Sequence, residues 1–190
     1  DVKRLLAYSS VEHMGIIAVG LGLGTFGAAY AALLHNAAHA LAKGLAFFAA
    51  GDVVERARSR RLPRLRGALT VMPWSGTLFL VALIALAGLP PFGIFTAEFL
   101  LLRALFCGGH PLLGLSVSLL LGLAFAGIVY QAATCMLGEP SRNLLQAGRE
   151  RFSLTAAAGV VMVLLLVALG AGLASPVQAL LVAAARVVIL

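Results

Sequence analysis

The chain has 190 residues, of which 62% are hydrophobic and only 11% are charged. Its mean hydropathy of +1.04 lies far outside the range of soluble domains, because a soluble helix needs a polar outer face. The formal net charge is +7, but the basic residues lie in short segments without interleaved aromatic side chains. The composition therefore excludes an ordinary water-soluble domain, argues against nucleic-acid binding, and predicts a protein of the lipid bilayer.

Six apolar segments are long enough to cross the hydrocarbon core of a membrane, which takes about 17 to 25 residues. They fall near 5–23, 26–51, 69–89, 91–108, 112–137 and 153–174. Between the third and fourth lies Gly88-Leu89-Pro90-Pro91-Phe92-Gly93, where two prolines lack amide donors and two glycines loosen the backbone, so we predict a broken helix there. The expected fold is an all-α, polytopic transmembrane helix bundle of about six spans.

Two expectations concern the ends of the chain. The chain begins at Asp1, without an initiator methionine or a leader, so we expect a fragment of a longer protein. We expect residues 1–174 to form the membrane domain. Residues 175–190 begin Ser-Pro and are short, so they are expected to form either an interfacial helix or the start of a truncated span.

The loop at residues 52–66 indicates the orientation in the membrane. It carries six arginines between Arg56 and Arg66, against two acidic residues. Loops rich in Lys and Arg stay in the cytoplasm, so we expect the Arg56–Arg66 loop on the cytoplasmic side. Lys3 and Arg4, two spans earlier, are expected on the same side. The loop at 138–152, with three arginines against two glutamates, is expected on the opposite side.

Ionisable residues inside the predicted spans are informative, because each costs about 2.5–3.5 kcal/mol at a helix centre. The set comprises Glu12, His13, His35, His39, Lys43, Glu98 and Arg103. We interpret Glu12, His13 and Arg103, which lie within about two turns of a span end, as side chains that reach the interface or pair locally.

Three of these residues recur at intervals of four within one predicted helix. His35, His39 and Lys43 share one slowly drifting stripe, with about 6 Å between neighbours. Histidine exchanges protons near neutral pH, and burial disfavours the charged form of a lysine. The spacing therefore predicts a proton relay through intervening water, although a single histidine on an apolar helix is more often a packing residue.

Glu98 follows the predicted break by a few residues, where freed backbone groups and water can solvate a carboxylate. An acidic residue beside a broken helix is typical of an ion pathway. The alternative is a neutralising pair with Arg103, which a spacing of five residues disfavours on a helix.

Three separated motifs resemble one known family. They are residues 1–10 with Met14-Gly15, the pattern His35-x-x-x-His39-x-x-x-Lys43, and residues 88–93 through Glu98-Phe99. The family is that of the proton-conducting, antiporter-like subunits shared by complex I, multisubunit Na⁺/H⁺ antiporters and membrane-bound hydrogenases. Within it, residues 10–15 and 39–43 most resemble the hydrogenase-4 component F type. The resemblance implies that the chain is the second inverted repeat of such a subunit, without its N-terminal half.

The resemblance also assigns roles to individual residues. Lys43 matches the central membrane lysine, His35 and His39 the histidines of the connecting water path, and Glu98 the terminal acid of the outer half-channel. Asp1 matches the acid of the linker. The implied function is proton translocation in a redox-driven respiratory complex of the hydrogenase-4, formate-hydrogenlyase or NADH-quinone oxidoreductase type. The alternatives are a subunit of a multisubunit cation/proton antiporter, with Na⁺ as a second coupling ion, and a structural membrane anchor.

The same resemblance implies the surroundings of the chain. We expect it to bind no cofactor or metal itself, since iron-sulfur, nickel-iron or flavin groups belong to partner subunits. The expected partners are other membrane subunits and a peripheral redox arm. The expected location is the cytoplasmic membrane of a bacterium or archaeon.

Overall fold

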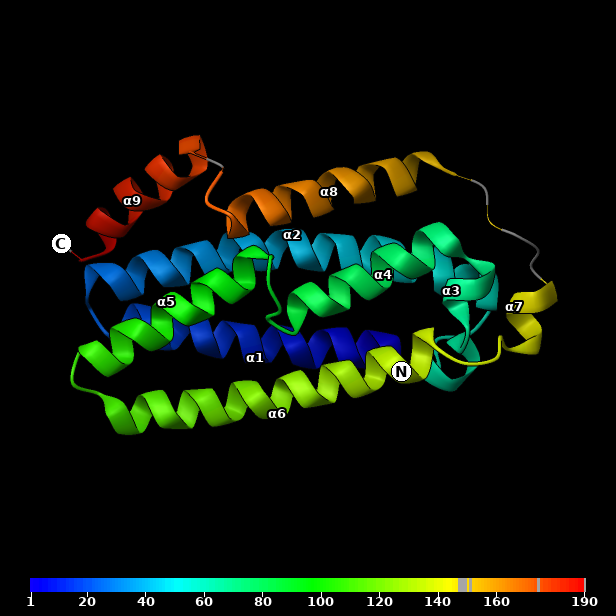
Figure 1. Cartoon of the computed structure of the whole chain (residues 1–190), viewed down its shortest axis with the longest axis horizontal. Coiled ribbons are helices and arrows are strands. Elements are labelled where there is room, and N and C mark those ends of the chain that lie inside the picture. The colour runs from blue at the N-terminus through cyan, green and yellow to red at the C-terminus, as the bar shows by residue number, and fades with distance from the viewer. Residues whose placement is uncertain (147–149, 151, 174, 190) are drawn as a thin grey trace.

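The structure, a computed structural model, describes residues 1–146, 150, 152–173 and 175–189, and contains helices but no strand within these ranges. The helices are α1 (Val2–Gly22), α2 (Phe26–Ala57), η1 (Leu62–Leu65), α3 (Ala68–Val71), α4 (Pro73–Leu86), α5 (Gly93–Cys107), α6 (Pro111–Met136), α7 (Arg142–Gln146), α8 (Leu154–Gly170) and α9 (Ser175–Ile189). The predicted all-α bundle is confirmed, and each of the six predicted apolar segments overlaps one of the longer helices (Figure 1).

The central element is α2, which has 32 residues and is therefore about 48 Å long. It runs along the bundle and packs against α1, α4, α5, α8 and α9 (Figure 1). Half of its residues are buried, and most of the buried ones are alanines, whose small side chains let neighbouring helices come close. At Gly20 of α1 an added Cβ would lie 2.9 Å from the Cβ of Ala32, so α1 and α2 are in direct contact.

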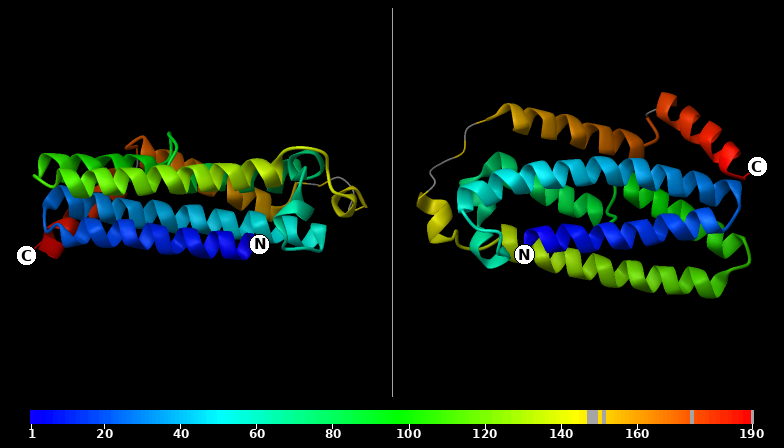
Figure 2. Two further views of the ribbon diagram at one scale, coloured as in Figure 1. Left: turned by 90° about the horizontal axis from the view of Figure 1, so that it is seen from below. Right: turned by 180° about the vertical axis from the view of Figure 1, so that it is seen from behind.

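The predicted break lies between α4 and α5. The backbone turns at Gly88, whose φ of +70° suits glycine, and Pro90 and Pro91 cannot donate the hydrogen bonds that would continue the helix. A new helix then begins at Gly93. Both views in Figure 2 show α4 and α5 following one another along the bundle.

The break changes the number of membrane crossings. At 14 and 15 residues, α4 and α5 are each only about 21–22 Å long, well short of the roughly 30 Å of a bilayer core. By length and composition, α1, α2 and α6 each reach the size of a membrane span on their own. The third and fourth predicted segments thus form two halves of one broken span.

One consequence is a correction to the predicted topology. The loop expected on the opposite side of the membrane from the arginine-rich loop lies beside it instead. The hydroxyl of Ser141 donates to the carbonyl of Arg64 over 2.7 Å, and the Asn143 amide donates to the carbonyl of Ala57 over 3.1 Å. The prediction was wrong because it counted α4 and α5 as two crossings; residues 149 and 151, two of this loop's arginines, lie outside the described residues.

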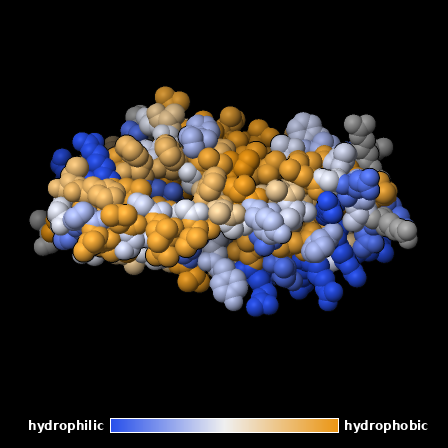
Figure 3. Space-filling view, turned by 60° about the horizontal axis from the view of Figure 1, so that its bottom comes forward, coloured by the Kyte–Doolittle hydropathy of each residue, from blue (hydrophilic) through white to orange (hydrophobic). Residues whose placement is uncertain are grey.

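The surface reflects this arrangement. Figure 3 shows the largest group of hydrophilic side chains at the end of the bundle that holds the arginine-rich loop, and apolar side chains over much of the remaining visible face. The membrane domain predicted for residues 1–174 therefore has one strongly basic end. The segment from 175 onward forms α9, which packs beside α2, and its predicted role as an interfacial helix or truncated span stays a prediction.

The contact between α8 and the break can be tested at Gly170. A Cβ at this position would collide with the carbonyl oxygen of Pro91 and lie 2.7 Å from the carbonyl carbon of Phe92, both of which are backbone atoms. We expect Gly170→Ala to lower the apparent melting temperature of the full-length protein in detergent, because overpacking costs about 1–3 kcal/mol.

Gly127→Ala is the matched control, since a Cβ at Gly127 meets nothing within 4 Å and alanine favours a helix. Equal melting temperatures for the Gly170→Ala variant and the unmodified protein would contradict the tight contact between α8 and the break.

Candidate functional site

The candidate site is a set of polar side chains buried where α1, α2 and α5 meet. On α2, His35, His39 and Lys43 are 1%, 6% and 7% exposed. Their four-residue spacing places them along one side of the helix, as the sequence predicts. Two of the three face a further buried group on α1 that the sequence analysis did not include in the site.

Lys43 is held by oxygen atoms of α1. Its Nζ donates to the carbonyl of Leu6 and to the hydroxyl of Ser9, each over 2.5 Å. The carbonyl of Leu6 also accepts from the hydroxyl of Ser10 over 3.1 Å. Among the described residues no carboxylate forms an ion pair with this ammonium within 4.0 Å. The amine therefore has two neutral oxygen partners, which leaves one of its three donors for water or a proton acceptor.

The group that the sequence analysis missed is His13 of α1. Its side chain is fully buried, and its Nδ1 lies 2.9 Å from Nε2 of His35. Its ring centroid is 4.4 Å from that of His39. The interpretation of His13 as a side chain that reaches the interface is therefore wrong. The signal was present in α1, whose buried positions 2, 6, 9, 13, 16 and 20 repeat every three or four residues and define the face toward α2.

The three histidines have spare hydrogen-bonding capacity. His13 Nε2, His35 Nδ1 and His39 Nδ1 are buried, and none of them has a partner among the described residues. A neutral imidazole offers one donor and one acceptor, so each unpartnered nitrogen is either an unused N–H or an unused lone pair. A buried polar atom without a partner costs about 1–3 kcal/mol, which favours a water molecule or an ion at these positions.

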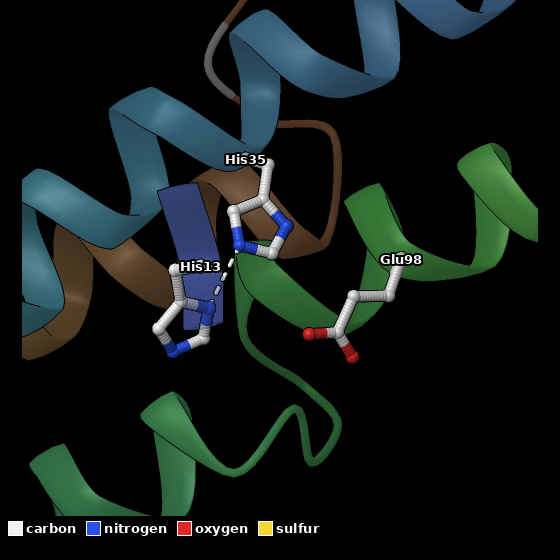
Figure 4. A group of neighbouring side chains, drawn as sticks. All are labelled: His13, His35 and Glu98. Atoms are coloured by element: carbon white, nitrogen blue, oxygen red, sulfur yellow. Dashed lines mark hydrogen bonds between the residues drawn. The ribbon is translucent and has the colours of Figure 1, made fainter. Parts of the chain in front are cut away.

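Glu98 completes the cluster from α5. Figure 4 shows its carboxylate pointing toward the rings of His13 and His35. One potential ligand atom from each of these three residues lies within 4.8 Å of the other two. Gly88 leaves room for this carboxylate, since a Cβ there would collide with Oε2 of Glu98 and lie 3.1 Å from its Cδ.

Arg103 and Asp1, two charged residues considered in the sequence analysis, both lie outside the buried cluster. Arg103 is exposed and forms neither a hydrogen bond nor an ion pair with Glu98 in the described part of the chain, so the alternative of a neutralising pair is wrong. Asp1 is exposed and caps α1, where its carboxylate accepts from the amide of Lys3 over 2.9 Å. The fold does not bring Asp1 into the buried cluster, and its predicted role as a linker acid stays a prediction.

A large cavity, of about 890 Å³, lies at the basic end rather than at the buried cluster. Its lining includes Asp52, Glu150 and Thr155. Glu150 accepts hydrogen bonds from the amides of Trp74 and Ser75, each over 3.0 Å, at the start of α4. The Ser75 hydroxyl contacts both Glu150 and Asp52. Glu150 thus caps the N-terminus of α4. The Ser75 hydroxyl, bonded to both Asp52 and Glu150, links α2 to the segment before α8.

The comparisons with known proteins agree with this architecture. Residues 1–125 match the family described as "NADH:quinone oxidoreductase/Mrp antiporter, TM". The chain belongs to this family. A hydrogenase-4 component F homolog from Methylacidiphilum infernorum is 37% identical over 166 residues, which cover 84% of this chain and 35% of the relative. NADH-quinone oxidoreductase subunit N from Desulforudis audaxviator is 35% identical over 176 residues, which cover 90% of this chain and 35% of the relative.

A solved structure shares the fold. The Mrp complex from a Dietzia species contains a chain that superposes with a TM-score of 0.82 at 23% identity, covering 97% of this chain and 42% of that one. The resemblance to the antiporter-like family noted from the sequence is thereby confirmed. The chain spans about a third of the length of the two curated relatives, so it corresponds to one part of proteins of this family.

The contact between Ser9 and Lys43 can be tested by removing one hydroxyl. Ser9→Ala leaves the buried ammonium with the Leu6 carbonyl alone, and we expect it to destabilise the full-length protein by about 1–3 kcal/mol. Ser10→Ala is the matched control, because Ser10 bonds the same carbonyl but does not touch Lys43. Thermal unfolding in detergent measures both. Equal losses in the two variants would show that the Ser9 hydroxyl does not support the amine.

Proposed function

We propose that this chain is the proton-conducting part of a membrane subunit in a redox-driven respiratory complex of the hydrogenase-4, formate-hydrogenlyase or NADH-quinone oxidoreductase type. The observation that carries the proposal is a line of exchangeable groups that runs from Lys43 through three buried histidines to the partly buried Glu98. Membership of the family and the names of the similar proteins support it.

In the proposed pathway, Lys43 holds a proton near the middle of the bundle. Its acceptors are neutral oxygens, and no carboxylate of the described residues lies within 4.0 Å of the ammonium to trap the proton. His39 lies one turn away on the same helix, about 6 Å along the axis, which one water molecule can bridge. The His13 ring then stands between His39 and His35, and Glu98 accepts or supplies the proton beside the helix break.

The proposed surroundings follow from charge and from the family. Ser141 and Asn143 of the loop at residues 138–152 contact the segment around the arginine-rich loop, and the positive-inside rule supports a cytoplasmic location for this end. The proposed membrane is that of a bacterium or archaeon. Iron-sulfur, nickel-iron or flavin groups belong to a peripheral redox arm in this proposal. Other membrane subunits are its partners within the bilayer, and this chain contributes the proton pathway alone.

Replacing the central lysine tests the proposal. In inverted vesicles that contain the complete complex with full-length subunit, we expect Lys43→Met to reduce redox-driven proton uptake at least about tenfold at matched electron-transfer rates, because the variant lacks the exchangeable amine. The pH change reported by an entrapped dye measures the uptake. Arg103→Met is the matched control, since it removes a cation from an exposed position on α5.

The assembled amount of each variant is compared by immunoblot, so that a loss of folding is not mistaken for a loss of transport. Undiminished uptake in Lys43→Met would contradict the relay and favour a structural membrane anchor.

The family description also names the Mrp antiporter, which favours a second candidate function. A subunit of a multisubunit cation/proton antiporter would use the same residues with Na⁺ or K⁺ as a second coupled ion. Proton uptake that persists without an electron donor and depends on an imposed Na⁺ or K⁺ gradient would support this candidate over the redox-driven pump.

The position of Glu98 can be tested through Gly88. Gly88→Ala places a methyl group against the carboxylate and forces it away from the histidines, so we expect proton uptake to fall several-fold while electron transfer continues. Gly109→Ala is the matched control, because Gly109 has a similar positive φ, of +82°, but open space around it. In both variants an alanine must adopt a positive φ, which strains the backbone. Only Gly88→Ala also displaces Glu98. Equal effects in the two would assign the loss to strain alone.

A further inference from the structure

Three side chains in the relay have the composition of a metal-binding site. They come from separate elements, His13 from α1, His35 from α2 and Glu98 from α5, and converge in Figure 4. We propose that they bind a transition-metal dication of the zinc class, which displaces the proton shared by the two histidines. The binding itself does not depend on the proposed function; its consequence for proton transport does.

The distances are compatible with such a site. One ligand atom from each residue lies within 4.8 Å of the other two, and His13 Nδ1 and His35 Nε2 are 2.9 Å apart. Tetrahedral zinc, with bonds of about 2.0–2.2 Å, separates its ligand atoms by roughly 3.3–3.5 Å. The imidazole pair therefore needs to open slightly and the carboxylate to approach. Glu98 can do so by side-chain rotation, since no hydrogen bond joins its carboxylate to His13 or His35 in Figure 4.

The inner nitrogens of the two rings, His13 Nδ1 and His35 Nε2, face one another and are the ligand atoms of the proposed site. His13 and His35 are 0% and 1% exposed, and the outer nitrogen of each ring has no partner among the described residues. In the metal-free pair, one ring must donate its proton to the other. When a dication takes the place of that proton, the proton moves to the outer nitrogen of the same ring, and both inner lone pairs bind the metal. A carboxylate as third ligand offsets part of the charge. A fourth position remains for water, as in zinc sites with three protein ligands.

The donor set also selects the class of metal. Two imidazoles and one carboxylate suit zinc and its neighbours nickel, copper and cobalt. Calcium requires six to eight oxygen ligands and magnesium near-octahedral oxygen coordination, neither of which one carboxylate supplies. Bound metal would join α1, α2 and α5 and occupy the nitrogens that the proposed relay uses. Micromolar zinc is then expected to inhibit proton uptake.

Zinc binding is tested on the full-length subunit purified in detergent, titrated with zinc sulfate in a calorimeter after treatment with a chelator. We expect the unmodified protein to bind one zinc ion, and His13→Gln and Glu98→Gln to bind it at least about tenfold more weakly, because each loses one of three ligands. His110→Gln is the matched control, since His110 is an exposed histidine at the start of α6. X-ray absorption at the zinc edge is expected to detect two imidazole ligands in the unmodified protein.

Equal zinc affinity in the unmodified protein, His13→Gln and Glu98→Gln would overturn the site, whatever the transport measurements give. A spectrum without imidazole ligands would overturn it independently of any effect of the substitutions on folding. If Lys43→Met abolishes proton uptake while the triad binds no zinc, the proposed function stands and the metal site fails. If the triad binds zinc and uptake does not depend on Lys43, the metal site stands and the proposed relay fails.

Discussion

The structure depends on how a buried ammonium group is solvated. Lys43 lies on the central helix of an apolar bundle, where an unpaired charge costs about 2.5–3.5 kcal/mol. Its partners are a backbone carbonyl and a hydroxyl of α1, so the amine is solvated only when α1 and α2 pack in one register. The alanine-rich surface of α2 and the contact at Gly20 permit this approach. The same register brings His13 against His35, which joins the histidines of two helices into one cluster.

The second determinant is the break between α4 and α5. The turn at Gly88 lets a carboxylate occupy space that a side chain would fill, and α5 restarts at Gly93 close enough to direct Glu98 toward the histidines. The backbone of α8 covers this region at Gly170, and the Thr96 hydroxyl donates to the Gly170 carbonyl over 3.0 Å. A helix interruption that is costly in lipid is therefore covered by α8 on one side, whereas Pro90 and Pro91 are exposed on the surface of this chain.

Features that depend on a single segment can be predicted from the sequence. Features that depend on how two segments pack against each other cannot. The stripe of His35, His39 and Lys43 follows from helical periodicity, and the break follows from the chemistry of proline and glycine. The role of His13 depends on which face of α1 packs against α2. The distance of His13 from the end of its span does not indicate that face. The side of the membrane on which the loop at 138–152 lies depends on whether α4 and α5 form one membrane crossing or two. The number of residues in each apolar segment does not decide between these two cases.

The His13–His35 pair limits how the cluster can carry charge. The hydrogen bond between the rings needs one N–H and one lone pair, so a second proton on the pair removes the acceptor and breaks the bond. The two protonated rings then repel each other with no bond between them, while α1 and α2 are held together at Gly20 and at Lys43. A doubly protonated pair is disfavoured by this geometry and by the nearby ammonium. In the proposed pathway, protons therefore pass through the cluster one at a time, and the departure of one is a condition for the arrival of the next.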